Sequence, residues 1–199
     1  MDKLTICNMA LSYIGDASID ALTEQTEPAR RCVQFFEHDR RLLLRRFPWP
    51  FATRRVELVA VTGTPPDYKY QFRYPSGCLC IRTLYAVNDT DDTLIPLPDF
   101  NEYKILGDTT GRLIYANEPR VVAEYTLDYE SYDNMDEQFI EVLAWKLASS
   151  IAFKLTGNPQ IVQMATQEYE RRYHEAIADA TNEQNIETPI LNTYAAARF

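Results

Sequence analysis

The sequence has few of the residues on which enzymes most often depend. It contains two histidines, His38 and His174, and six glycines among its 199 residues. It has neither the GxGxxG nor the GxxxxGK pattern of a phosphate-binding loop. Neither histidine has a serine or cysteine at the spacing of a local catalytic motif. These absences predict a protein that is not an enzyme and that holds no cofactor and no metal ion.

Long apolar segments are also absent. No run of apolar residues approaches the roughly 18 that a membrane-spanning helix needs. The first 15 residues form an amphipathic, charge-bearing pattern, which differs from the continuous apolar centre of a signal peptide. We therefore expect a folded protein that is made in the cytoplasm and has no contact with a membrane.

Cysteine is too scarce for a disulfide framework in a chain of this length. An intracellular origin would keep the thiols reduced, and free cysteine on an apolar face behaves as a small hydrophobic residue. We expect buried thiols without chemistry at Cys7, Cys32, Cys78 and Cys80.

Charge is distributed unevenly along the chain. The formal net charge is −9, yet residues 30–55 hold eight arginines and two acidic residues, a net +6, so the remainder carries −15. An acidic body is repelled by DNA and by anionic membranes, which argues against general affinity for either. The basic segment is therefore the exception that needs an explanation.

Residues 28–51, PARRCVQFFEHDRRLLLRRFPWPF, contain this basic segment and begin as a helix. Apolar residues recur at three- and four-residue spacing, as on one face of a helix. Thr26 can cap the helix and Pro28 fits its first turn, whereas Pro48 and Pro50 end it near Phe47. The apolar face is Ala29, Cys32, Val33, Phe36, Leu43 and Leu44.

The remaining pattern predicts an α+β fold. Helices are expected at 2–14, ending at Gly15, at about 133–156, capped by Asp133, and from Pro159 to about Ala180. Short strands separated by turns are expected between them, among them 56–61, 68–74 and 78–87, as in a small antiparallel sheet or barrel. The predicted organisation is an N-terminal helical hairpin (1–52), a β-rich insertion (53–132), a C-terminal helical pair that completes a bundle (133–180) and an extended tail (181–199).

The arginines have three possible roles. They could bind nucleic acid, they could be a solvated helix face without function, or they could form a subunit interface with carboxylates of another copy. An enzyme that uses a divalent cation is the weakest alternative, because neither acidic cluster of the sequence has the spacing of a calcium loop. The first cluster is Asp89, Asp91 and Asp92, and the second is Asp128, Glu130, Asp133 and Asp136. We favour the interface, in which a basic face and an acidic body associate head to tail and can close into a ring.

Several segments resemble the tail tubular protein A family, the head-to-tail adaptors (gatekeepers) of short-tailed bacteriophages. The similar runs are ALSYIGDASIDALTEQTEPARRC at 10–32 and RRLLLRRFPWPFATRRVEL at 40–58, with Ile-Gly, Ala-Arg and Trp-x-Phe at the positions typical of the family. The runs YKYQFRYPSGCLCI at 68–81 and FIEVLAWKLASSIAFKLTGNPQ at 139–160 also look like its tyrosine-rich strand and its C-terminal helices.

The resemblance implies a structural virion protein, made in the host bacterial cytoplasm, that links the portal to the tail nozzle. Copies would form a ring, expected to be a dodecamer, whose channel passes DNA during ejection without binding it. Carboxylates would face this channel. The residues expected at the subunit interface are Arg30, Arg31, Arg40, Arg41, Arg45, Arg46 and Trp49, and those expected to dock on the portal are Ile190, Leu191, Tyr194 and Phe199.

Overall fold

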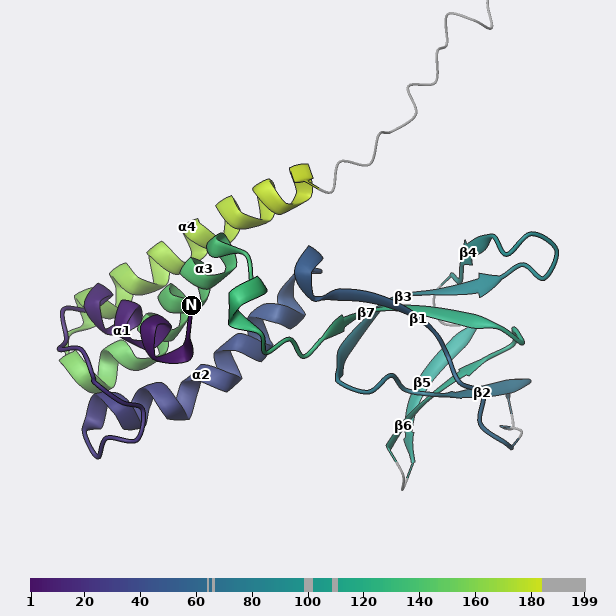
Figure 1. The fold of residues 1–199 in the computed structure, drawn as a ribbon, viewed down its shortest axis with the longest axis horizontal. Coiled ribbons are helices and arrows are strands. Elements are labelled where there is room, and N and C mark those ends of the chain that lie inside the picture. Colours follow the sequence, from purple (N-terminus) through teal and green to yellow (C-terminus); the bar gives the residue numbers. More distant parts are fainter. Residues whose placement is uncertain (64, 66, 99–101, 109–110, 184–199) are drawn as a thin grey trace, which may run out of the picture.

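The computed structural model describes residues 1–63, 65, 67–98, 102–108 and 111–183. Figure 1 shows an elongated molecule with the helices at one end and the strands at the other. The chain passes from helices to strands after α2 and returns to helices after β7. The described part is therefore an α+β fold in which the strands are inserted between two helical segments, and the α+β prediction is confirmed.

Four α-helices make up the helical part of the described chain: α1 (Lys3–Tyr13), α2 (Glu27–Arg46), α3 (Glu137–Thr156) and α4 (Pro159–Glu183). The predicted terminators are present, because Gly15 and Gly157 both have positive φ and Pro159 opens α4. The cap of α3 was predicted wrongly. Asp136, not Asp133, accepts the backbone N–H groups of Gln138 and Phe139, because residues Tyr132–Asn134 form a separate 3-10 turn.

Helix α3 lies at the centre of the bundle. It is apolar around most of its circumference, as the sequence predicts for a helix buried on several sides. Helices α1, α2 and α4 each pack on it, so the main partner of α1 and α2 is α3 rather than each other. The shared core includes Leu11, Phe36, Leu44, Leu143 and Leu147, all with at most 1% of their surface exposed.

The strands form two antiparallel sheets. The first has the order β1 (Thr53–Glu57), β7 (Val121–Leu127), β3 (Cys78–Val87), β4 (Leu94–Pro96), and the second has the order β2 (Tyr70–Arg73), β6 (Gly111–Ala116), β5 (Tyr103–Asp108). Their own core contains Phe72, Leu84, Ile114, Val121 and Ala123. Strand β1 starts three residues before the predicted strand at 56–61 and ends four residues before it.

Residues 58–61 explain that difference, because they cross from one sheet to the other. Leu58 N–H donates to the Val121 carbonyl at 2.8 Å, and Arg73 N–H of β2 donates to the Val59 carbonyl at 2.9 Å. On the opposite side, β4 and β5 each end their sheet, and no strand of the described residues joins them. The β region is therefore two small sheets and not the closed barrel that the sequence left open as an alternative.

Candidate subunit-interaction site

The side chains of α2 divide into those that hold the chain together and those that remain on its surface. Arg40 belongs to the first group, since its side chain is fully buried. Its guanidinium lies 2.8 Å from an Asp128 oxygen and donates hydrogen bonds to the Tyr129 carbonyl at 2.5 Å and to Glu37 at 3.0 Å. Burial lowers the pKa of Arg40, but Asp128 and Glu37 outweigh this effect and raise it. Arg40 therefore stays charged and binds α2 to the segment that follows β7.

The same cluster extends to its neighbours on both sides. Arg41 lies 2.9 Å from the second oxygen of Asp128, and Lys3 of α1 donates to Glu37 at 2.8 Å. Burial raises the pKa of Glu37, but the hydrogen bonds from Lys3 and Arg40 dominate and lower it. Three separate parts of the chain thus meet through charge-assisted contacts at this point.

Arg82 of β3 makes a second junction that sequence reasoning missed. Its guanidinium donates to the carbonyls of Leu44 and Arg45 at 3.0 and 2.9 Å, and to the Thr126 hydroxyl at 2.8 Å. The last carbonyls of a helix lack partners within the helix, and a cation there is favoured by the helix dipole. An arginine within an otherwise apolar strand was the available signal for this role.

Arg46 binds α4. It donates to the Tyr169 hydroxyl at 2.5 Å and to Glu170 at 3.2 Å, and it stacks over the Tyr173 ring at 4.2 Å. The hydrogen bond to Glu170 raises the pKa of Arg46. Arg46 therefore has carboxylate and aromatic partners within its own chain.

Trp49 is also an internal residue, with 1% of its surface exposed. Its indole N–H donates to the Leu43 carbonyl at 3.0 Å, and its ring packs edge-on against Phe139 of α3 at 5.0 Å. Of the seven residues predicted at a subunit interface, Trp49 and Arg40 have no surface that a second subunit could reach in the folded chain. The period of α2 could have identified Arg40, which lies four residues from both Phe36 and Leu44 on the apolar face.

The outward face of α2 keeps a smaller basic set. Arg30 is exposed and contacts only Gln25, at 3.4 Å, and Arg45 donates to the Leu79 carbonyl. Arg31 pairs with Glu27 of its own helix at 2.6 Å. Val33 and Leu42 are exposed as well, at 47% and 45% of their surfaces, but nine residues of helix place them on opposite sides of α2. We define the outer face of α2 as Arg30 and Arg45.

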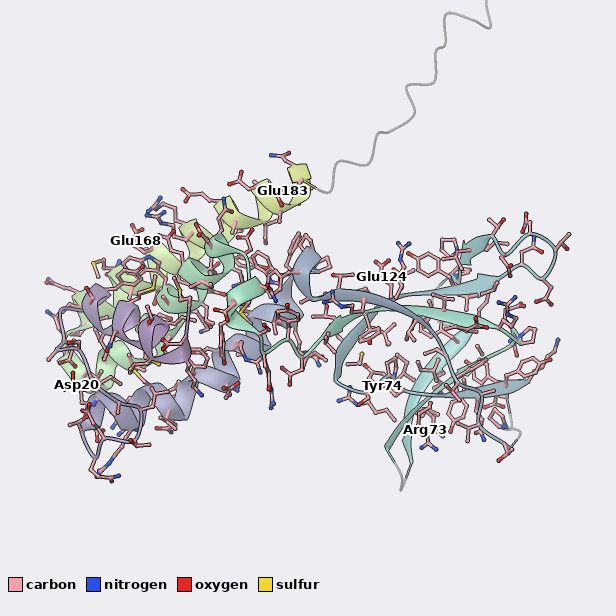
Figure 2. All side chains as sticks on the ribbon, viewed as in Figure 1. Asp20, Arg73, Tyr74, Glu124, Glu168 and Glu183 are labelled. Atoms are coloured by element: carbon pink, nitrogen blue, oxygen red, sulfur yellow. The ribbon has the colours of Figure 1, made fainter. Side chains whose placement is uncertain are left out.

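Helix α4 has the opposite charge balance. It contains five carboxylates and two arginines, whereas α2 contains six arginines and three carboxylates. In Figure 1, α2 and α4 run along opposite sides of the helical part. Figure 2 shows Glu168 and Glu183 on the outer side of α4. The two helices therefore differ in the sign of their formal net charge.

Asp39 is the one acidic residue of α2 that is buried, with 1% exposure. One of its carboxylate oxygens has no hydrogen-bond partner among the described residues, and the other lies 4.0 Å from the Lys146 ammonium. Burial raises the pKa of Asp39, although Ser150, Lys146 and His38 oppose the shift. The ionised form is therefore less stable in the folded chain than in the unfolded chain.

This carboxylate predicts a pH-dependent effect of Asp39→Asn. Because the folded-state pKa is raised, ionisation destabilises the fold progressively as pH rises from below the unfolded pKa to above the folded pKa. We expect the variant to unfold at a higher denaturant concentration than the wild type at pH 7, with the advantage shrinking toward pH 4. The exposed Asp20→Asn is the matched control. An advantage of Asp39→Asn that is constant from pH 4 to pH 7 would contradict this account.

The other predicted residues fall into three groups. The tail residues Ile190, Leu191, Tyr194 and Phe199 lie outside the described residues. Each predicted acidic cluster contains carboxylates that pair with cations of the chain, such as Asp92 with Arg120 at 2.9 Å and Asp128 with Arg40 at 2.8 Å, and no group of residues suited to a metal ion occurs in the described part. Cys7 and Cys32 are buried free thiols, as predicted, whereas Cys78 and Cys80 are only half-buried.

No helix in the described ranges is long and apolar enough to cross a membrane.

Comparison with known proteins does not assign the chain to a family. No protein-family model matches it, and no curated protein matches it. Among solved structures, a similar chain belongs to the neck of an empty GTA particle computed with C6 symmetry. That chain is 13% identical, with a TM-score of 0.28, and the match covers 82% of the present chain and 87% of the other.

Proposed function

We propose that this chain is a structural virion protein, a head-to-tail adaptor whose copies form a ring between the portal and the tail nozzle of a bacteriophage. The observation that carries the proposal is that Arg30 and Arg45 stay exposed on the outer face of α2 with no ion pair in the described part, while the acid-rich helix α4 lies on the opposite side of the bundle. Two different surfaces that attract each other give a heterologous contact, which closes into a ring when the rotation between copies permits. The resemblance of residues 10–32 and 40–58 to the adaptor family supports the same conclusion.

The partners and location follow from this proposal. The ring, a dodecamer by the family resemblance, sits in the virion between the portal protein and the nozzle protein, and DNA passes through it during ejection without specific binding. Such a protein has no enzymatic activity. The C-terminal tail (181–199), which includes Ile190, Leu191, Tyr194 and Phe199, is the proposed portal-docking segment.

The alternative of a nucleic-acid-binding module is less favoured. Arg40, Arg41 and Arg46 all have carboxylate partners within the chain, which leaves few cations of α2 free for phosphate groups. The adaptor proposal predicts no retention of DNA by the purified protein at low salt. Salt-sensitive retention would instead support the nucleic-acid module.

The direct test is the mass of the purified protein, measured by light scattering, alone and after mixing with its portal ring. We expect the protein to load onto the portal in a stoichiometric ring. The double variant Arg30→Glu/Arg45→Glu should weaken this loading by roughly tenfold or more, because two attractive contacts become repulsive. The control Arg73→Glu changes an exposed arginine of β2 and should load as the wild type does.

Three outcomes would count against the proposal. Wild-type protein that stays monomeric in the presence of the portal would contradict the adaptor function. Equal loading by the double variant and the wild type would contradict the role of the outer face of α2. Equal loss of loading in Arg73→Glu would show a general effect of negative charge.

A further inference from the structure

A groove with a volume of about 440 Å³ lies where the two sheets fail to meet. Residues of the first half of β3 and of β5 line it, with Arg45, Tyr74 and Arg112 beside them, so apolar side chains alternate with polar ones. Ile105 and Leu106 of β5 leave 37% and 43% of their surfaces exposed there, and Leu79 and Ile81 of β3 are half-buried. Neighbouring exposed apolar residues that line a hollow are typical of a binding surface.

Both walls of this groove are strand edges that lack a neighbouring strand in the described chain. Strand β4 pairs only with Tyr85, Ala86 and Val87 of β3, so the first half of β3 has no strand on that side. Strand β5 is the last strand of its sheet. Uncovered edges are sites where another chain can associate, and proteins usually cover or block them.

Two arginines border the groove, and its lining contains no carboxylate. Arg45 donates to the Leu79 carbonyl, and Arg112 lies over the Tyr74 ring at 5.2 Å. Neither has an ion-pair partner in the described part of the chain. Figure 2 labels Tyr74 within this part of the β region. The groove therefore fits a segment that presents an apolar side chain next to a free carboxylate.

The turn between β3 and β4 presents that combination. Ile95 of β4 leaves 51% of its surface exposed. Asp91 is exposed, and its carboxylate accepts the Thr93 N–H at 3.1 Å, whereas Asp89 and Asp92 pair with Arg120. Asp91 thus has no cation partner within the described residues.

A chain cannot place this turn in its own groove. The groove lies at the beginning of β3, and the turn follows its end, ten residues later. At roughly 3.3 Å per residue, the two sites are about 30 Å apart along one strand. Figure 1 agrees, with the β3–β4 turn at the end of the molecule away from α2. The occupant must therefore come from another molecule.

We propose that the β3–β4 turn of one copy docks in the groove of the next copy. Ile95 would contact Leu79, Ile105 and Leu106, and Asp91 would pair with Arg112 and Arg45. Each copy then contributes one turn and one groove, so the contact is heterologous and continues around a closed ring. This inference rests on the proposed ring function and adds a second contact to that of α2 with α4. Arg45 takes part in both, so the new contact is tested at Asp91 and Arg112, which belong to it alone.

Charge exchange between two variants tests the contact. Asp91→Lys places a cation at position 91 of the turn and leaves the groove basic, and Arg112→Glu leaves the turn unchanged and places a carboxylate in the groove beside Arg45. We expect each variant alone to load onto the portal ring roughly tenfold less than the wild type. An equimolar mixture should restore loading, because the lysine at position 91 of one variant meets the carboxylate at position 112 of the other.

The outcomes separate this contact from the proposed function. Loading of both single variants at the wild-type level would overturn the docking contact and leave the ring function intact. Failure of the mixture would also overturn it, since each substitution would then act in another way. Failure of the wild type itself would instead overturn the ring function. The melting temperatures of both variants are the control for folding and are measured on the monomers by circular dichroism. They should equal that of the wild type, because both side chains are exposed. A lower melting temperature in either variant would assign its lost loading to misfolding and overturn the contact.

Discussion

Trp49→Ala is expected to lower the free energy of unfolding by about 3–5 kcal/mol, the range for truncation of a buried aromatic residue. The indole is 1% exposed, packs edge-on against Phe139 and Phe47, and donates to the Leu43 carbonyl. Alanine would leave a cavity at the point where α2 turns into β1 and would leave that carbonyl without its donor. Urea unfolding followed by circular dichroism measures the loss.

Phe153→Ala is the matched control for this prediction. Phe153 lies on α3 with 60% of its surface exposed, so its truncation should change the free energy of unfolding by no more than about 0.5 kcal/mol. The sequence also allows Trp49 to be an interface residue. A Trp49→Ala monomer that unfolds like the wild type but fails to assemble would support that role and contradict the buried role.

Arg40→Met should destabilise the fold by about 3 kcal/mol. Removing one partner of a buried ion pair leaves the other charge without compensation, which typically costs about 3–5 kcal/mol. We expect the lower end of this range because Arg41 still pairs with Asp128 and Lys3 still donates to Glu37. Methionine keeps most of the apolar contact of the arginine side chain, so the loss reports on the guanidinium.

Arg30→Met is the control, because Arg30 is exposed and contacts only Gln25. It should be within about 0.5 kcal/mol of the wild type. The double variant Arg40→Met/Asp128→Asn should recover part of the lost stability, since it removes the uncompensated carboxylate. Equal stability of Arg40→Met and Arg30→Met would show that the buried cluster does not hold α2 to the segment after β7.

Local signals in the sequence predicted most element positions. Pro48 ended α2 after Arg46, and Gly157 with Pro159 separated α3 from α4. The strand at 78–87 was predicted with the bounds that the structure has. These signals act over a few residues, through backbone geometry and side-chain period, so one chain segment contains all the information they need.

The partners of the arginines were not predictable in the same way. The six arginines of α2 are similar in sequence, yet Arg40 is buried against Asp128, 88 positions later, while Arg30 remains on the surface. Position on the apolar face could have identified Arg40 as internal, but it would not have identified the partner. The prediction of a seven-residue interface therefore grouped side chains that the fold separates.

The sequence by itself determined the helices, most of the strands, the α+β class and the concentration of positive charge on one helix, because periodicity, capping residues and composition are local properties. Only the tertiary structure decided which charges neutralise one another within the chain and which stay exposed. It also decided that the sheets remain open between β3 and β5. These outcomes depend on distances between segments far apart in sequence, which packing around α3 and the crossing at residues 58–61 establish.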